Sequence, residues 1–177
     1  MYFRFDVFLT DEDYMDFNTF ILLNSEQNIK NYRKLSIFCV IIFLISGIVA
    51  VVNTGSLLAF VGVLPFAVAG VFGVKPFIVN FTKRQIKANL KKGKKPYSPE
   101  AVMEFFDEWF SETTPENATQ QKYNAIEKIW VSEKGTVYIF INNYQAYNIP
   151  YRTFHAPEEF DCFMNFMHTK CADIKFY

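Results

Sequence analysis

The strongest pattern along the chain is a run of forty residues, Leu35–Val74, that contains no charged side chain. Two blocks in it, residues 35–52 and 57–74, have 15 and 14 apolar residues out of 18, and the turn-forming residues 53–56 separate them. A helix of 18 residues is about 27 Å long, close to the hydrocarbon thickness of a bilayer. The pattern predicts a hairpin of two transmembrane helices rather than a signal peptide or a buried core hairpin.

Small residues recur four positions apart on each predicted span, and such residues let two helix backbones approach closely. We expect the spans to pack through Ser46 and Ala50 on the first and Ala69 and Gly73 on the second. Pro65 is expected to bend the second span or to leave one carbonyl oxygen for a neighbouring group. Because the spans contain no ionisable residue, they are expected to form an anchor rather than an ion pathway.

Alternation of apolar and polar residues predicts a short strand over residues 2–8. Thr10 is expected to cap a helix over about residues 11–23, because three acidic residues follow it in the first turn. The sequence leaves open whether this N-terminal strand joins a sheet formed by the C-terminal part of the chain.

Residues 96–177 predict a small domain of antiparallel strands closed by one helix, a pattern typical of a pleckstrin-homology-like domain. A hairpin that turns near Asp107 and Glu108 is expected first, although Ser98–Glu100 would also suit a helix start. Further strands are expected over residues 120–132, 136–141 and 145–149. The last helix should run from Pro157 to about Thr169, with its stripe of Phe and Met in the core.

Charge is strongly segregated along the chain, although 18 basic and 18 acidic side chains cancel. Residues 30–95 carry eleven bases and no acid, whereas residues 1–29 carry six acids and residues 96–177 carry twelve. Basic residues flank both spans and are missing from the turn between them, which predicts that both termini are cytoplasmic. Because the domain after the spans is acidic, we do not expect the chain to bind nucleic acid.

The basic segment that follows the second span is the candidate membrane-surface site. It is expected to continue as a helix from Phe77 to about Lys92. Contact with anionic lipid headgroups is worth about 1 kcal/mol per basic side chain near the surface. The residues expected there are Lys83, Arg84, Lys87, Lys91, Lys92, Lys94 and Lys95.

The sequence contains no recognisable catalytic constellation, so we expect neither an enzyme nor a cofactor. His155, Cys162, His168 and Cys171 lie near one another and could suggest zinc. On one helix, however, Cys162 and Cys171 point in opposite directions, and the two ligands that share a face do not complete a tetrahedral site. No metal site is therefore predicted, and three widely spaced Cys residues do not form a disulfide framework.

Several short motifs occur in a particular order along the chain. They are Leu9–Tyr14 with Phe17, Asn24–Ser25 before a basic stretch, the two spans, Tyr123–Ile129, Asn148–Phe154, and Glu159, Phe160 and Phe163. In this order they resemble the YcxB-like family of bacterial membrane proteins over nearly the whole chain. The resemblance implies a transmembrane hairpin with a cytoplasmic pleckstrin-homology-like domain, and it supplies no catalytic residues. Tyr151 departs from the family, which often has a basic residue there.

These features predict a membrane α+β protein in which a two-helix transmembrane hairpin carries a small antiparallel β domain capped by a C-terminal helix. The expected parts are residues 1–29, residues 30–95 with the hairpin, and residues 96–177. We expect a multi-pass protein of the bacterial inner membrane that presents its domain to a protein partner or a lipid headgroup. The alternative is an accessory subunit of a transporter or channel. Besides the lipid bilayer, the expected partner is an integral membrane protein or a second copy of the chain.

Overall fold

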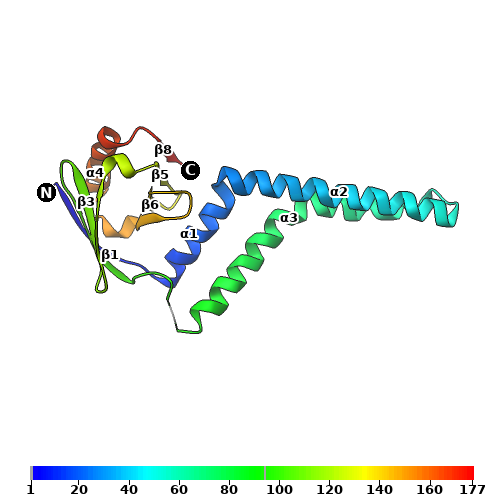
Figure 1. Cartoon of the computed structure of the whole chain (residues 1–177), viewed down its shortest axis with the longest axis horizontal. Helices are drawn as coiled ribbons and strands as arrows, with labels where there is room; N and C mark the ends of the chain where they lie inside the picture. The colour runs from blue at the N-terminus through cyan, green and yellow to red at the C-terminus, as the bar shows by residue number, and fades with distance from the viewer. Residues whose placement is uncertain (1, 94) are drawn as a thin grey trace. The chain divides into compact units, whose positions relative to one another are not determined.

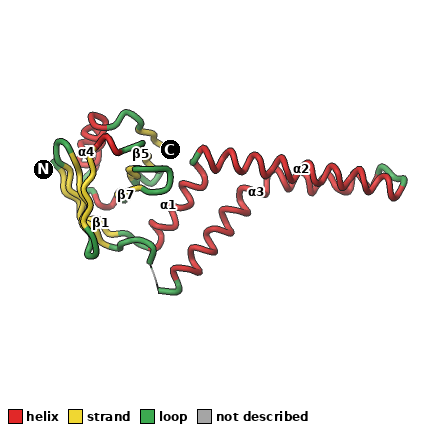
Figure 2. Tube along the Cα trace, in the orientation of Figure 1, coloured by secondary structure: helices red, strands yellow, loops and turns green. Residues whose placement is uncertain are grey.

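The chain forms two compact units in a computed structural model that describes residues 2–93 and 95–177 (Figure 1). The first, here called the β unit, takes the chain up to Phe17 and again from Gly93 onward. The second, the helical hairpin, is Asn18–Lys92. Helix α1 (Asp11–Asn24) begins in the β unit and ends in the hairpin, and every strand belongs to the β unit (Figure 2). The predicted layout of two long apolar helices and antiparallel strands is confirmed.

The hairpin consists of α2 (Glu26–Thr54) and α3 (Leu58–Leu90), which run side by side (Figure 1). Both helices are long and apolar enough to cross a membrane. Gly55 ends α2 with a φ of 67° and donates its N–H to the carbonyl oxygen of Val51, because glycine adopts this left-handed backbone without steric cost. Helix α3 continues through Pro65 and Pro76.

The two helices contact each other at glycine residues that admit aromatic rings. A Cβ atom on Gly47 would lie 2.6 Å from the ring of Phe60, and one on Gly70 would lie 3.1 Å from Cβ of Cys39. Near the open end of the hairpin, Ser36 Oγ donates a hydrogen bond to the carbonyl oxygen of Val71.

This contact differs from the one expected from small residues four positions apart. Ser46 and Ala69 are exposed and Ala50 is half-buried, and a Cβ built on Gly73 would have no described atom of α2 within 4 Å. The contact uses the next residue along each helix, Gly47 and Gly70. Since successive helical residues point about 100° apart, a shift of one residue turns a side chain out of the interface.

The β unit contains two four-stranded sheets. Sheet A has the order β1-β2-β3-β4, from β1 (Phe3–Phe8), β2 (Glu100–Phe105), β3 (Trp109–Thr113) and β4 (Ala118–Lys122). Sheet B has the order β7-β6-β5-β8, from β5 (Lys128–Val131), β6 (Val137–Phe140), β7 (Ala146–Ile149) and β8 (Ile174–Phe176). All pairs are antiparallel except β5 with β8. Helix α4 (Pro157–Lys170) and two short 3₁₀ helices, η1 (Tyr123–Ala125) and η2 (Tyr151–Thr153), complete the unit.

The N-terminal strand joins the sheet formed by the later part of the chain. Phe3 lies opposite Phe105 and Phe8 lies opposite Glu100, so β1 and β2 pair along their full length. Along the sequence, the whole helical hairpin is therefore an insertion between β1 and β2, which are neighbouring strands of sheet A.

The core of the β unit combines buried residues of sheet A, sheet B and α4 and is rich in Phe. Phe5, Phe105 and Phe163 are fully buried, and the Phe163 ring lies 4.9 Å from that of Phe105 and 5.1 Å from that of Phe5. Met164 and Met167 are buried on the same helix. The predicted stripe of Phe and Met is thus part of the core, as aromatic edge-to-face packing favours.

Two parts of the β unit differ from the sequence expectation. The predicted strand over residues 120–132 is divided by η1, where the chain passes from sheet A to sheet B. Strand β8 was not expected, because three residues give too short a pattern to recognise. The hairpin between β2 and β3 turns at residues 106–108, as predicted.

Candidate functional site

The basic residues predicted for the membrane surface lie at the end of α3 and in the segment after it. Lys83, Arg84 and Lys87 are on α3, whereas Lys91 and Lys92 follow its last residue, Leu90. Of these, Lys83 is half-buried and the other four are exposed. Lys95 belongs to the β unit, where its Nζ lies 3.9 Å from Asp11 Oδ1. Lys94 lies outside the described residues.

A polar cluster surrounds the first turn of α1, which the sequence predicted to be capped by Thr10. The backbone N–H of Asp13 donates to Thr10 Oγ1 over 3.2 Å, and the N–H of Thr10 donates to Asp13 Oδ2 over 2.7 Å. This reciprocal arrangement satisfies two backbone donors at the helix start. Arg152, which lies in η2, donates to both Asp13 oxygens and to the carbonyl oxygen of Phe8.

The charges of this cluster are paired with one another. Burial alone would raise the pKa of Asp13, but hydrogen bonds from Arg152 and Thr10 and the charge of Arg152 lower it to about 2. Lys134 forms an ion pair with Asp16, and the Tyr97 hydroxyl donates to Asp11. Burial and the Asp11 charge together raise the pKa of Tyr97. The cluster therefore ties the start of α1 to the β unit, and its pairing leaves few groups for a ligand.

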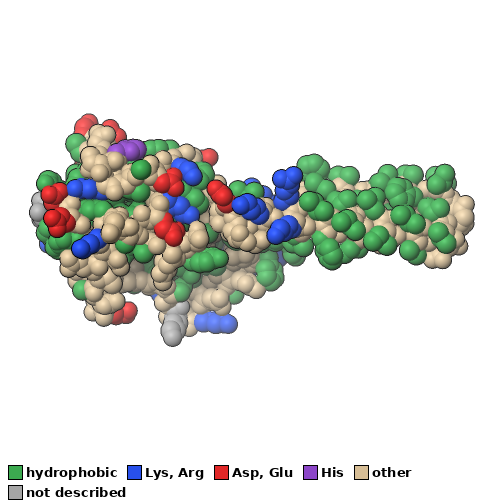
Figure 3. All heavy atoms as spheres, turned by 45° about the horizontal axis from the view of Figure 1, so that its top comes forward, with side chains coloured by type: hydrophobic (Ala, Val, Ile, Leu, Met, Phe, Trp, Pro, Cys, Tyr) green, Lys and Arg blue, Asp and Glu red, His purple; other side chains and the backbone are tan. Residues whose placement is uncertain are grey.

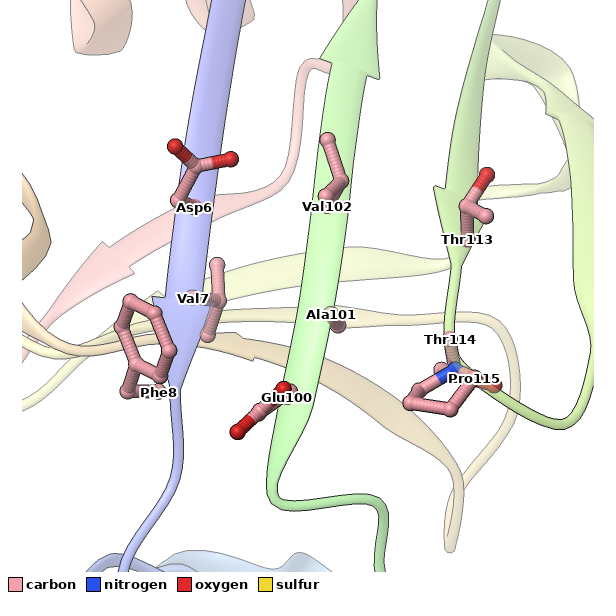
Figure 4. Close-up of a pocket in the computed structure, with 9 residues that line it drawn as sticks. All are labelled: Asp6, Val7, Phe8, Glu100, Ala101, Val102, Thr113, Thr114 and Pro115. Atoms are coloured by element: carbon pink, nitrogen blue, oxygen red, sulfur yellow. The ribbon is translucent and has the colours of Figure 1, made fainter.

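A groove of about 290 Å³ lies across β1, β2 and β3 at one end of sheet A (Figure 4). Its lining is formed by Asp6, Val7, Phe8, Glu100, Ala101, Val102, Thr113, Thr114 and Pro115. The strand register sets Asp6 opposite Val102 and Phe8 opposite Glu100, with Thr113 next to Val102 on β3. Because side chains alternate along a strand, these five residues share the outer face of the sheet, whereas Val7 and Ala101 are buried on the other face.

The outer groove combines apolar surface with two carboxylates. Phe8 is 59% exposed although it is a large apolar residue, and Asp6 and Glu100 lie beside it in the register. The β unit carries 17 acidic and nine basic side chains. A side chain with an aliphatic stem and a cationic head, such as Lys or Arg, fits this chemistry.

Sequence reasoning missed this groove, because its residues lie on strands that are almost a hundred positions apart. One signal was present within β1, where Phe8 shares the polar face of the strand with Arg4 and Asp6. A single exposed apolar residue is common on protein surfaces, so this signal alone does not identify a contact site.

The residues considered for a metal site are not brought together. The His155 ring lies 3.1 Å from Glu159, four residues along on α4, and Cys162 is exposed on the same helix. In residues 2–93 and 95–177, no group of three His, Cys, Asp or Glu side chains is placed to hold a metal ion.

Comparison with known proteins connects the β unit to one family. No curated protein and no solved structure matches the chain. A family model described as YcxB-like protein matches residues 105–167, which run from the last residue of β2 to the last turns of α4. This part of the β unit therefore matches the YcxB-like protein family, the family that the order of the sequence motifs resembles.

Proposed function

We propose that the chain is a membrane-anchored binding protein. In this proposal the hairpin crosses the bacterial inner membrane twice, and the pleckstrin-homology-like β unit faces the cytoplasm. The outer groove of sheet A binds a protein partner through a segment that combines apolar and basic side chains. The observation that carries the binding role is the exposed Phe8 between the carboxylates of Asp6 and Glu100.

The membrane anchor is supported by the apolar side chains that the hairpin leaves uncovered (Figure 3). Val52, Leu58 and Phe72 are 77%, 79% and 75% exposed. Among the described residues of α2 and α3, Gly47 and Ala67 are the ones that are buried. A hairpin in a soluble core would be covered by the rest of the protein, whereas hydrocarbon chains would cover this one.

The proposed orientation rests on where the hairpin is charged. Ser36 lies level with Val71, and the 18 residues from there to Thr54 at the tip extend about 27 Å, enough to cross the hydrocarbon layer. Arg33, Lys34 and Lys75 lie just outside this length, and the tip carries no charge. Since basic residues are retained in the cytoplasm, the start of α2 and the end of α3 are both assigned to the cytoplasmic side. The pairing of β1 with β2 supports this, because the strands flank the hairpin.

The pleckstrin-homology-like assignment rests on the order of the elements. A four-stranded meander is followed by three strands of a second sheet and then by α4, whose Phe163 and Met167 enter the core. Strand β8 is an addition to that pattern, since it follows the helix and pairs in parallel with β5.

A protein partner is favoured over an anionic lipid headgroup for the groove, because like charges repel. Carboxylates border the groove, and acids outnumber bases in the β unit. Anionic headgroups are instead assigned to the basic residues from Lys83 to Lys95. The alternative function, an accessory subunit of a transporter or channel, would use the exposed faces of α2 and α3 rather than the groove.

Membrane topology can be tested by thiol labelling of spheroplasts with an impermeant maleimide. A Ser56→Cys variant should be labelled directly, because residue 56 lies in the turn at the tip of the hairpin. The native Cys162, which is exposed, should be labelled only after permeabilisation and serves as the internal control. Labelling of Cys162 in intact spheroplasts would contradict the proposed orientation.

Binding at the groove can be tested by photo-crosslinking in cells. With p-benzoylphenylalanine incorporated at Phe8, we expect one predominant adduct to another protein, and Glu100→Lys should reduce its yield at least about tenfold. The matched control carries the same crosslinker at Gln120, which is exposed on β4. Equal adducts from both positions, or an unchanged yield with Glu100→Lys, would refute the groove. An adduct to a polytopic protein from positions on α2 alone would favour the accessory-subunit alternative.

A further inference from the structure

We infer that the free edge of β1 pairs antiparallel with β1 of a second copy of the chain, centred on Phe5. Sheet A of each copy would then continue into the other as one eight-stranded sheet. The inference rests on three observations, which are the open edge, the order of charges along β1 and the exposed residues at its two ends.

Strand β1 is an edge strand with β2 as its one partner in the sheet. Figure 4 shows it as the outermost strand on its side of sheet A. It has six residues, more than the other three described edge strands, β4, β7 and β8. Arg152 donates to the carbonyl oxygen of Phe8 at one end. A long edge strand with unpaired backbone groups is a template for pairing with another chain.

The order of charges along β1 selects one register. If Phe5 lies opposite Phe5 of the second copy, Arg4 lies opposite Asp6 of that copy, and Asp6 lies opposite its Arg4. Both side chains point to the outer face and are more than half exposed. Their contacts within one chain are long, at 3.8 Å between Arg4 and Asp6 and 3.5 Å between Arg4 and Glu104. Opposite charges directly across a strand pair stabilise it.

Other registers lack this complementarity. Centring the pair on residue 4 or on residue 6 sets like charges opposite each other, and a shift by one residue would pair the outer face with the buried face. Of the other described edge strands, β4 and β8 each carry a Lys and no acid, and β7 carries no charge. Reciprocal ion pairs about a two-fold axis, as isologous dimers require, are therefore specific to β1.

The same register brings together the two exposed aromatic residues at the ends of the strand. Tyr2 and Phe8 are 60% and 59% exposed, and Tyr2, whose ring also lies 5.3 Å from that of Phe166 on α4, would lie opposite Phe8 of the second copy. The Tyr2 N–H bonds to the carbonyl oxygen of Phe105 and Arg152 donates to that of Phe8, so these two end residues would add side-chain contacts rather than backbone hydrogen bonds. Aromatic pairs across strands add to the stability of the interface.

One added strand buries less surface than the roughly 800 Å² per partner of a stable interface. The dimer should therefore be weak for dilute chains and stronger where both copies are held in one membrane, which raises their effective concentration. The stronger pairing in a membrane rests on the proposed anchor, whereas the register of the strand pair does not depend on the anchor.

The test uses charge exchange in the full chain, reconstituted at two copies per nanodisc and read by energy transfer between labels on Cys162. Arg4→Asp sets acids opposite acids, and Asp6→Arg sets bases opposite bases. Each should weaken pairing at least about tenfold. The double variant with both changes should pair like the wild type. A mixture of the two single variants should pair as well, because acids then face bases.

Gln120→Asp on β4 is the matched control and should leave pairing unchanged, since it alters charge on the other edge of the same sheet. The inference would be overturned if energy transfer between two wild-type chains were no higher than expected for two chains placed at random in one nanodisc. Single variants that pair as well as the wild type would overturn it too, as would failure of their mixture to pair. Glu100 lies on β2 and takes no part in this pairing, so the effect of Glu100→Lys on the crosslink yield tests the groove independently of the result here.

Discussion

Changing Asp13 to Asn should loosen the attachment of α1 to the β unit without altering the shape of the side chain. The amide oxygen can still accept the hydrogen bond from Thr10, but the negative charge that faces Arg152 is lost. The pKa of Asp13 is lowered from 3.8 to about 2, and each pKa unit corresponds to about 1.4 kcal/mol. Arg152 is 51% exposed, so solvent screens part of this attraction. We expect a loss of about 1–2 kcal/mol in the free energy of unfolding at pH 7.

The pH dependence of this loss has a definite sign. A carboxylate whose pKa is lower in the folded state stabilises that state fully above its unfolded pKa, near 3.8, and the stabilisation disappears as the pH falls towards 2. Wild type and Asp13→Asn should therefore differ at pH 7 and converge near pH 2. Urea unfolding of the full chain in detergent micelles can be followed by fluorescence, because both Trp residues, Trp109 and Trp130, lie in the β unit.

The matched control is Glu116→Gln, which makes the same chemical change at an exposed turn position and should alter stability by less than about 0.5 kcal/mol. Equal stabilities of wild type and Asp13→Asn at pH 7 would refute the reasoning. A difference that persists undiminished at pH 2 would also refute it, because the effect would then not come from the charge.

Three further predictions follow from packing. Phe163→Ala should lower the free energy of unfolding of the β unit by about 3–5 kcal/mol in the same assay, because Phe163 is fully buried, whereas Cys162→Ala beside it should have little effect. Gly135→Ala should destabilise the unit by about 1–3 kcal/mol, since Gly135 has a φ of 76° and its new Cβ would lie 2.7 Å from the Tyr151 ring; equal stability in urea would contradict this. Gly47→Leu should lower the thermal unfolding temperature of the hairpin in detergent, measured by circular dichroism at 222 nm, because the side chain would overlap the ring of Phe60, while Gly73→Leu should not.

Features encoded by neighbouring residues could be predicted from the sequence. The uncharged run from Leu35 to Val74 forms the later part of α2, the turn and the first part of α3. Thr10 caps α1 as its sequence context predicted, and the Phe and Met stripe of α4 is buried. In each case the signal lies in consecutive or regularly spaced residues of one segment, so it can be recognised without knowing which distant segment packs against it.

Features that depend on distant pairing could not be predicted. The groove requires Phe8 and Glu100 to lie opposite each other, and no periodicity within either strand specifies that register. The contact between α2 and α3 was expected at Ser46 and Ala69, whereas it uses the next residue of each helix, Gly47 and Gly70. The small size of a residue does not reveal which side of its helix faces the other helix. Gly47 and Gly70 lie in the contact because the rings of Phe60 and Phe43 occupy the space beside them on the opposite helix. The sequence of one chain does not show which residues of the two helices lie opposite each other.

The insertion of the hairpin between β1 and β2 sets the order in which the protein can be made. Strand β1 leaves the ribosome first but cannot pair until β2 is synthesised, about ninety residues later, which takes about 5–20 s at usual elongation rates. If the hairpin spans the bilayer as proposed, both helices must enter it during that interval. If the second helix failed to return, β1 and β2 would lie in different compartments, and sheet A could not close. In the proposed topology, closure of the sheet thus depends on correct insertion, and a chain with the wrong number of crossings would leave β1 and β2 unpaired and open to proteolysis.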